Sequence, residues 1–257
     1  MIVACLRYTF KKYFVYFSYY INELIGGVVF PLFFNILFWG EILKGNSIGY
    51  DFKYITTYMI VSNITFYVTN IDISRVVSDD IKSYKLGKKM LYPVRYVKKI
   101  LLETNLTTLF RVIIIYVPVC LGLFLFDRVN LEFFNLSCWI ISMLIAIAIN
   151  LLVSLLIGFC SFYMTEIWGL EAFKNLVFYA FSGTFIPFDI LQNEIQKIVY
   201  MTPFPFVSYF PAKLLSDEKY NLFKGYFQVS FFWIGVLSIL VFGMWKFGIK
   251  KYESCGV

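Results

Sequence analysis

Side chains that could do chemistry are few in this chain, and none is arranged as a catalytic site. Histidine, the commonest metal ligand and general base, is absent. The 16 carboxylates are scattered, and no base stands beside a serine or cysteine that could serve as a nucleophile. The nearest match to a phosphate loop, Leu86-Gly-Lys-Lys, lacks both the upstream glycine and the hydroxyl residue. We therefore expect no enzyme activity in this chain, no ATP hydrolysis by it and no metal or cofactor bound to it.

The five cysteines show no paired spacing such as C-x-x-C. Cys5 and Cys255 lie near the two ends of the sequence, whereas Cys120, Cys138 and Cys160 lie in or beside apolar runs. Cysteines in such surroundings behave as small apolar side chains, so we expect no metal or redox site from them.

The composition points to a lipid environment. Of the 257 residues, 60% are hydrophobic and 15% are charged, and the mean hydropathy is +0.73. Soluble domains hold about 45–50% apolar and about 25% charged residues. A bilayer core needs about 20 apolar residues per helical crossing, so a chain of this length has room for about six crossings.

The apolar runs predict an all-α polytopic membrane protein with a single transmembrane domain over residues 1–257. The six expected transmembrane helices cover residues 24–43, 54–73, 106–126, 136–163, 172–188 and 225–247. Basic and aromatic residues alternate over residues 3–20, which predicts an interfacial elbow helix before the first crossing. In the first crossing, Gly26, Gly27 and Pro31 permit close packing or a kink.

Three polar residues give the second crossing a face that we expect to look inward: Asn63, Asn70 and Asp72. Arg111 falls in the first turns of the third crossing. We expect its guanidinium to reach back to the interface as an anchor, with a buried polar contact as the alternative.

The one long polar stretch covers residues 75–99 and is rich in lysine and arginine. Ser78 is a suitable N-cap, Asp79 and Asp80 follow it in the favoured first turn, and Gly87 can end a helix. The stretch therefore predicts a surface helix over residues 79–86. This helix either docks a partner or is only a solvated basic loop that sets the orientation of the protein.

An unusual segment follows the fifth crossing. Residues 189–215 are too apolar for an ordinary loop and too rich in proline for a crossing. Irregular backbone at membrane depth is tolerated only where protein covers it or where it lines a cavity, so we expect an external re-entrant segment. It either gates a pathway or only caps the bundle.

Charge predicts the orientation. With this topology, 16 lysines and arginines lie on one side and 7 on the other, and the richer side is expected to be cytoplasmic. Both termini are then cytoplasmic. The 30 Phe and 20 Tyr indicate either an A/T-rich genome that fills lipid-facing positions, which suits a bacterial source, or an aromatic pocket for hydrophobic cations.

Three local patterns resemble one family. The stretch Ser78-Asp-Asp-Ile-Lys-Ser-Tyr-Lys-Leu, with Leu91-Tyr-Pro-Val-Arg-Tyr after it, resembles the cytoplasmic stretch of the type-2 ATP-binding-cassette (ABC) exporter permeases. Phe181-Ser-Gly-Thr-Phe-Ile-Pro-Phe with Pro203-Phe-Pro-Phe-Val-Ser-Tyr-Phe-Pro-Ala resembles the viologen-exporter-like members. The basic tail from Trp245 through Tyr252 to Gly256 is also similar to theirs.

The resemblance implies an exporter subunit in the plasma membrane that moves an amphipathic or lipophilic compound or peptide outward. It implies separate ATPase subunits that bind ATP and Mg, a second copy or a similar permease as partner, contact with membrane lipid and no nucleic acid. The ATPase-coupling residues would be Asp79, Asp80, Ile81 and Tyr84. The external gate residues would be Ser182, Gly183, Pro187, Pro203, Phe204, Phe206 and Tyr209. An immunity or sensor protein that binds a hydrophobic peptide, or a lipid-modifying membrane enzyme, is the alternative.

Overall fold

A computed structural model describes residue 15 and residues 17–45, 52–70, 73–90, 96–126, 133–216 and 226–252. All regular elements within these ranges are helices, so the predicted all-α fold is confirmed for them. Most of the predicted elbow helix over residues 3–20 lies outside the described residues, as does Asp72.

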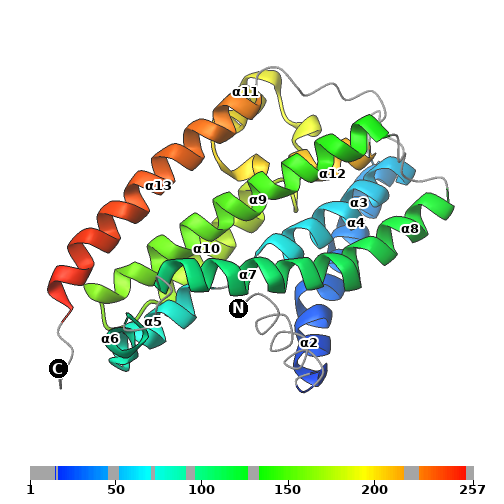
Figure 1. The fold of residues 1–257 in the computed structure, drawn as a ribbon. Helices are drawn as coiled ribbons and strands as arrows, with labels where there is room; N and C mark the ends of the chain where they lie inside the picture. Colours follow the sequence, from blue (N-terminus) through cyan, green and yellow to red (C-terminus); the bar gives the residue numbers. More distant parts are fainter. Residues whose placement is uncertain are drawn as a thin grey trace.

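The helices follow one another along the chain and pack as a bundle whose long members run between two ends (Figure 1). The α-helices are α2 (Phe17–Leu24), α3 (Phe30–Gly45), α4 (Phe52–Thr69), α5 (Ser74–Lys82), α6 (Lys85–Met90), α7 (Tyr96–Arg111), α8 (Val117–Leu125), α9 (Phe133–Phe159), α10 (Trp168–Phe181), α11 (Asn193–Tyr200), α12 (Tyr209–Ser216) and α13 (Tyr226–Lys251). π turns join α2 to α3 (η1, Ile25–Val29) and α7 to α8 (η2, Val112–Tyr116), and 3-10 turns are η3 (Cys160–Phe162), η4 (Phe188–Ile190) and η5 (Phe204–Phe206). In Figure 1, α5 and α6 lie at one end of the bundle and α11 lies at the other.

Four helical segments are long and apolar enough to cross a membrane. They are Tyr20–Ile42, Tyr96–Leu125, Leu136–Phe162 and Phe227–Lys251, and they match the first, third, fourth and sixth predicted crossings. Many of their large apolar side chains are exposed, among them Phe30, Phe33, Leu125, Phe232 and Ile239. Exposure on this scale suits contact with lipid acyl chains.

The second and fifth predicted crossings are not among these four long apolar segments. α4 has 18 residues, and most of its polar side chains, Asn63 included, are buried inside the bundle, as the inward-facing prediction requires. α10 begins at Trp168 and ends at Phe181, so its 14 residues are shorter than a bilayer core requires. The predicted crossing over 172–188 is therefore wrong in its bounds, because Gly183 adopts φ +84° and turns the chain before Pro187.

The bend between α2 and α3 has a clear cause. The π turn contains Gly26 and Gly27, and a Cβ at Gly27 would lie 3.1 Å from the ring of Tyr67. Pro31 follows and lacks an amide hydrogen for the helix ladder. α2 accordingly leaves the direction of α3 (Figure 1).

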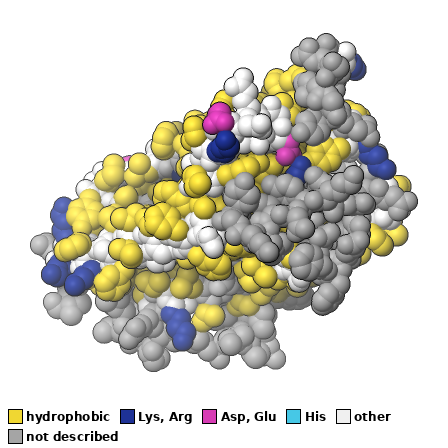
Figure 2. All heavy atoms as spheres, turned by 90° about the horizontal axis from the view of Figure 1, so that it is seen from above, with side chains coloured by type: hydrophobic (Ala, Val, Ile, Leu, Met, Phe, Trp, Pro, Cys, Tyr) yellow, Lys and Arg dark blue, Asp and Glu magenta, His cyan; other side chains and the backbone are white. Residues whose placement is uncertain are grey.

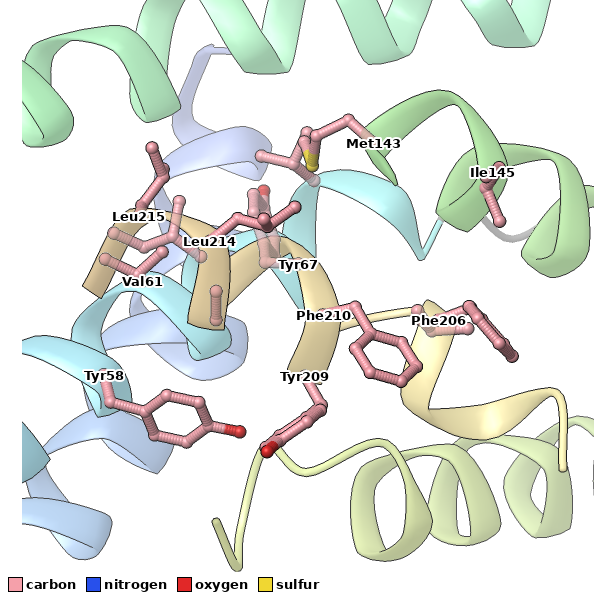
Figure 3. Packing of buried hydrophobic residues seen from close by; sticks show 14 of the residues in the cluster. Tyr58, Val61, Tyr67, Met143, Ile145, Phe206, Tyr209, Phe210, Leu214 and Leu215 are labelled. Carbon is pink, nitrogen blue, oxygen red and sulfur yellow. The ribbon is translucent and has the colours of Figure 1, made fainter. Parts of the chain in front are cut away.

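Two clusters of buried apolar residues hold the bundle together. The larger one joins α3, α4, α9 and the segment from η4 to α12, and Figure 3 shows part of it, with Leu214 and Leu215 beside Val61 and with Phe206 near Phe210. The smaller cluster joins α5 and α6 to α7, α9 and the end of α13. The larger cluster therefore lies behind the predicted external segment, and the smaller cluster lies behind the predicted coupling segment.

Candidate functional site

The α5–α6 corner replaces the single surface helix predicted over residues 79–86. α5 begins at Ser74, and Ser78 lies buried within it, so Ser78 is not the N-cap; Gly87 lies inside α6 and does not end the helix. The physical reason is the apolar spacing of Ile73, Val77 and Ile81, which places all three on one helix face against α9. Burial of this stripe outweighs the capping preference of Ser78.

The chain turns between α5 and α6 at Tyr84, which has a φ of +56°. A non-glycine residue rarely adopts this left-handed conformation, so the surrounding contacts must hold it. The Tyr84 ring lies 6.3 Å from the ring of Tyr252, and the Tyr252 hydroxyl accepts a 3.2 Å hydrogen bond from the amide of Gly87. The end of α13 thus fixes the corner.

The four predicted coupling residues point in two directions. Asp79 and Tyr84 are exposed, whereas Asp80 and Ile81 are buried. Ile81 and Tyr84 therefore do not form one docking face, because helix α5 ends at Lys82 and Ile81 packs inward.

Asp80 joins the corner to α7. Its two carboxylate oxygens each lie 2.6 Å from Nζ of Lys89, and the Tyr96 hydroxyl donates to Oδ2 at 2.9 Å. A carboxylate that is 5% exposed needs such partners to offset the hydration that it has lost. Asp80 therefore acts within the corner and not at its surface.

Val76, Asp79, Ser83 and Tyr84 are exposed on the corner and are called its exposed face below; the basic residues Arg75, Lys85 and Lys88 are exposed there too. Val76 and Tyr84 are 51% and 52% exposed, which is high for large apolar side chains beside an ionic surface. The sequence prediction missed Val76, although its position three residues before Asp79 places the two on one face of a helix.

A buried acid joins α5 to α10. Glu171 is 3% exposed, its Oε1 accepts a 2.8 Å hydrogen bond from Ser74, and its Oε2 lies 3.2 Å from Nη2 of Arg75. Glu171 precedes the predicted crossing over 172–188, but in the structure it lies in the first turn of α10. On α9, a Cβ at Gly158 would come within 2.9 Å of Val77, so α5 also lies directly against α9.

Two buried cations lie at the same end of the bundle. Lys174 donates to Oδ1 of Asn70 and to Oγ of Ser154, both at 3.2 Å. Arg111 is 6% exposed, pairs with Glu23 and donates to the carbonyl of Tyr67 at 3.1 Å. The predicted anchor role of Arg111 is therefore wrong, and the alternative of a buried polar contact is confirmed. Buried charges of this kind are costly in a membrane protein and mark functional regions.

The predicted gate residues meet at the other end of the bundle. Gly183 has φ +84°, and a Cβ there would lie 2.8 Å from Cβ of Tyr209 and 2.9 Å from the hydroxyl of Tyr58. Figure 3 shows the hydroxyl groups of Tyr58 and Tyr209 pointing to one place, the former from α4 and the latter from the start of α12. Only glycine fits between them.

The turn after α10 is held by hydrogen bonds to four successive carbonyl groups. They run from the Tyr209 amide to Ser182 (2.9 Å), from the Tyr58 hydroxyl to Gly183 (2.7 Å), from Asn35 to Thr184 (3.3 Å) and from Trp39 to Phe185 (3.0 Å). Irregular backbone inside a membrane protein requires this satisfaction of its polar groups. The turn is thus tied to α3, α4 and α12 together.

An ion pair that the sequence reading missed lies beneath this turn. Nζ of Lys213 lies 2.9 Å from Oδ2 of Asp189; the Lys213 side chain is buried, at 6% exposed, and the Asp189 side chain is partly buried, at 14% exposed. Tyr209 donates to the same carboxylate at 2.8 Å, and the Tyr54 hydroxyl lies 2.6 Å from Nζ of Lys213. Through Tyr54, the pair holds residues 189–213 against α4. Because Asp189 and Lys213 are 24 residues apart, no local sequence pattern predicts that they pair.

The remaining predicted gate residues shape the segment. Phe204 contacts the rings of Phe178 and Phe181, at 5.3 and 6.0 Å between centroids, and Phe206 contacts Phe210 at 4.8 Å. Pro187 and Pro203 stand directly before η4 and η5. α12 itself is buried from Tyr209 to Leu215 and packs on both α4 and α9. The segment therefore fills this end of the bundle.

Across the described residues, no three His, Cys, Asp or Glu side chains are grouped so that they could hold a metal ion. The carboxylates at both ends are engaged by lysine, arginine or hydroxyl groups.

Comparison with known proteins identifies a family for nearly the whole chain. The model of a family described as ABC-2 family transporter protein matches residues 25–256. No curated protein matches the chain.

Proposed function

The chain belongs to the ABC-2 family of transporter proteins, and on this premise we propose that it exports an amphipathic or lipophilic compound or peptide. It is a permease component of an ABC transporter and a multi-pass membrane protein. Permeases of this family generally work with ATP-binding-cassette ATPase subunits. In this proposal ATP and Mg bind to those subunits and none of the chemistry occurs on this chain.

The observation that carries the proposal is the attachment of the α5–α6 corner to three helices at once. Asp80 ties it to α7, Glu171 ties it to α10, and Val77 packs on Gly158 of α9. A partner that moves the exposed face of Val76, Asp79 and Tyr84 would move all three helices. This is the mechanical property that a coupling element needs.

The segment from the turn at Gly183 to α12 supplies the second element of the proposed mechanism, the external gate. In this conformation α12 and the turn at Gly183 close the far end of the bundle, and we assign them as an external gate. Opening would require the Asp189–Lys213 pair and the hydrogen bonds to the turn to rearrange. Tilting of α10, which connects Glu171 to Gly183, would carry movement from one end to the other.

The assembly that we propose contains two permeases and two ATPases in the plasma membrane, with both termini and the α5–α6 corner in the cytoplasm. The excess of 16 basic residues over 7 supports this orientation. The many Phe and Tyr residues, whose codons are rich in A and T, support a bacterial source.

Export is tested with inside-out membrane vesicles that contain the chain and the ATPase that copurifies with it. Added ATP should drive uptake of a fluorescent lipophilic cation or an amphipathic peptide into the vesicle lumen, because the cytoplasmic face points outward. Uptake should fail with a non-hydrolysable ATP analogue. A chain that copurifies with no ATPase would instead be an immunity or sensor protein.

A further inference from the structure

A cavity separate from both functional segments lies between α7, α9 and α13. Its volume is about 520 Å³, within the range of about 300–1,000 Å³ typical of ligand pockets. The lining is apolar, with Val97 and Leu101 from α7, Leu152 and Leu155 from α9, and Val241 and Phe242 from α13. Ser238 and Phe242 are exposed, so the cavity opens on the side of the bundle.

Two stacked aromatic rings close one end of the cavity. Tyr96 and Trp245 lie 5.8 Å apart with an interplanar angle of 11°, and the Tyr96 hydroxyl is held by Asp80 of the α5–α6 corner. Because Tyr96 begins α7 and Trp245 lies near the end of α13, the two helices run in opposite directions here. Trp and Tyr side chains are enriched where a protein meets the membrane–water interface.

Cations gather at this same end. Lys98 is three residues before Leu101 and Lys246 is four residues after Phe242, so each lies one helical turn from a cavity residue. Both are exposed, and in the described part of the chain neither pairs with a carboxylate. Figure 2 shows hydrophobic side chains across the body of one face and a group of Lys and Arg side chains at the end where α13 finishes.

We propose that this cavity binds one acyl chain of an anionic phospholipid from the cytoplasmic leaflet, with Lys98 and Lys246 holding its headgroup. An apolar slot with two exposed cations one helical turn from its lining residues matches a molecule that has a long apolar chain and an anionic head. Juxtamembrane cations attract anionic lipids of the cytoplasmic leaflet. Since the cavity ends at Tyr96, the lipid touches the residue that joins Asp80 to α7.

The test uses the full chain in vesicles that contain lipids with brominated acyl chains, which quench tryptophan fluorescence on contact. The quenching of Trp245 is the difference between the wild-type protein and Trp245→Phe. Brominated phosphatidylglycerol should quench Trp245 more than brominated phosphatidylcholine at equal mole fraction. Lys98→Gln and Lys246→Gln should each reduce this preference about fivefold.

Matched controls separate the site from general charge and size effects. Lys197→Gln removes the same charge from exposed α11 and should leave the preference unchanged. Ser238→Phe fills the cavity mouth and should lower quenching by both lipids, whereas Ile239→Phe, at a 72% exposed neighbour, should not. Equal quenching by the two lipids in the wild-type protein overturns the proposal. Absence of Trp245 quenching by either lipid also overturns it, because another protein surface then covers the cavity.

Discussion

The Tyr96 hydroxyl donates a 2.9 Å hydrogen bond to the Asp80 carboxylate, and this contact joins the α5–α6 corner to the first turn of α7. Lys89 neutralises the same carboxylate from α6. The corner is therefore fastened to the helix bundle by a charged group that is buried at its centre, while its outer face stays open to a partner.

Loss of the Tyr96 hydroxyl should weaken coupling without removing the docking face. In Tyr96→Phe the buried Asp80 loses one hydrogen bond, and bonds to charged groups contribute about 1.5–3 kcal/mol. We expect normal copurification of the ATPase but reduced stimulation of its hydrolysis by substrate. Tyr116→Phe, which removes a buried hydroxyl that contacts Thr65 and Trp139 outside both functional segments, is the control and should keep full stimulation. Full stimulation in Tyr96→Phe would show that this bond does not transmit movement.

The Asp189–Lys213 pair should show strong non-additivity. Lys213→Met leaves the partly buried Asp189 without its cation, and breaking a buried pair costs about 3–5 kcal/mol. The double variant Asp189→Asn/Lys213→Met removes both charges and should regain most of the thermal stability measured in detergent. Additive losses in the double variant would contradict a buried ion pair.

Gly183 should tolerate no side chain. Gly183→Ala places a Cβ 2.8 Å from Tyr209 in a backbone with φ +84°, where the left-handed conformation alone costs about 1–2 kcal/mol. We expect a lower unfolding temperature and loss of transport. Gly235→Ala in α13 has no atom within 4 Å of the added Cβ, so it should be neutral or slightly stabilising. Equal behaviour of the two variants would argue against the tight turn.

Orientation can be read by labelling single cysteines in a variant that lacks the native ones. Ser83 on the corner and Lys197 on α11 are both exposed and lie at opposite ends of the bundle. An impermeant maleimide added to whole cells should label Lys197→Cys but not Ser83→Cys. Labelling of Ser83→Cys from outside would reverse the topology.

Sequence patterns predicted the elements that depend on local spacing. The apolar runs located four spans, and the glycine and proline residues near 26–31 located a bend, whereas the turn at Gly183 lay inside a predicted crossing. The start of α5 was missed, because packing of Ile73 and Val77 on α9 outweighs a good N-cap at Ser78. Glu171 and Lys213 were missed for another reason: their partners are far away in the sequence, so no local pattern marks them.

The sequence predicted the exposure of only some of the candidate coupling residues. Asp79 and Tyr84 lie on the exposed corner as expected, whereas Asp80 and Ile81 face inward. The helical periodicity of the sequence alone could not predict which face of α5 is buried, because the residues that cover the inner face belong to α7, α9 and the end of α13.

The central claim is that an ATPase docks on the exposed face of the α5–α6 corner, and copurification in mild detergent tests it most directly. Val76→Ala/Tyr84→Ala removes both exposed apolar side chains, and loss of one central anchor typically costs at least about 2 kcal/mol, or roughly thirtyfold in affinity. The control Ile198→Ala/Met201→Ala truncates two similarly exposed side chains at the other end of the bundle. We predict that the wild-type protein and the control retain the ATPase and that Val76→Ala/Tyr84→Ala loses it. Full ATPase recovery with Val76→Ala/Tyr84→Ala would contradict the claim.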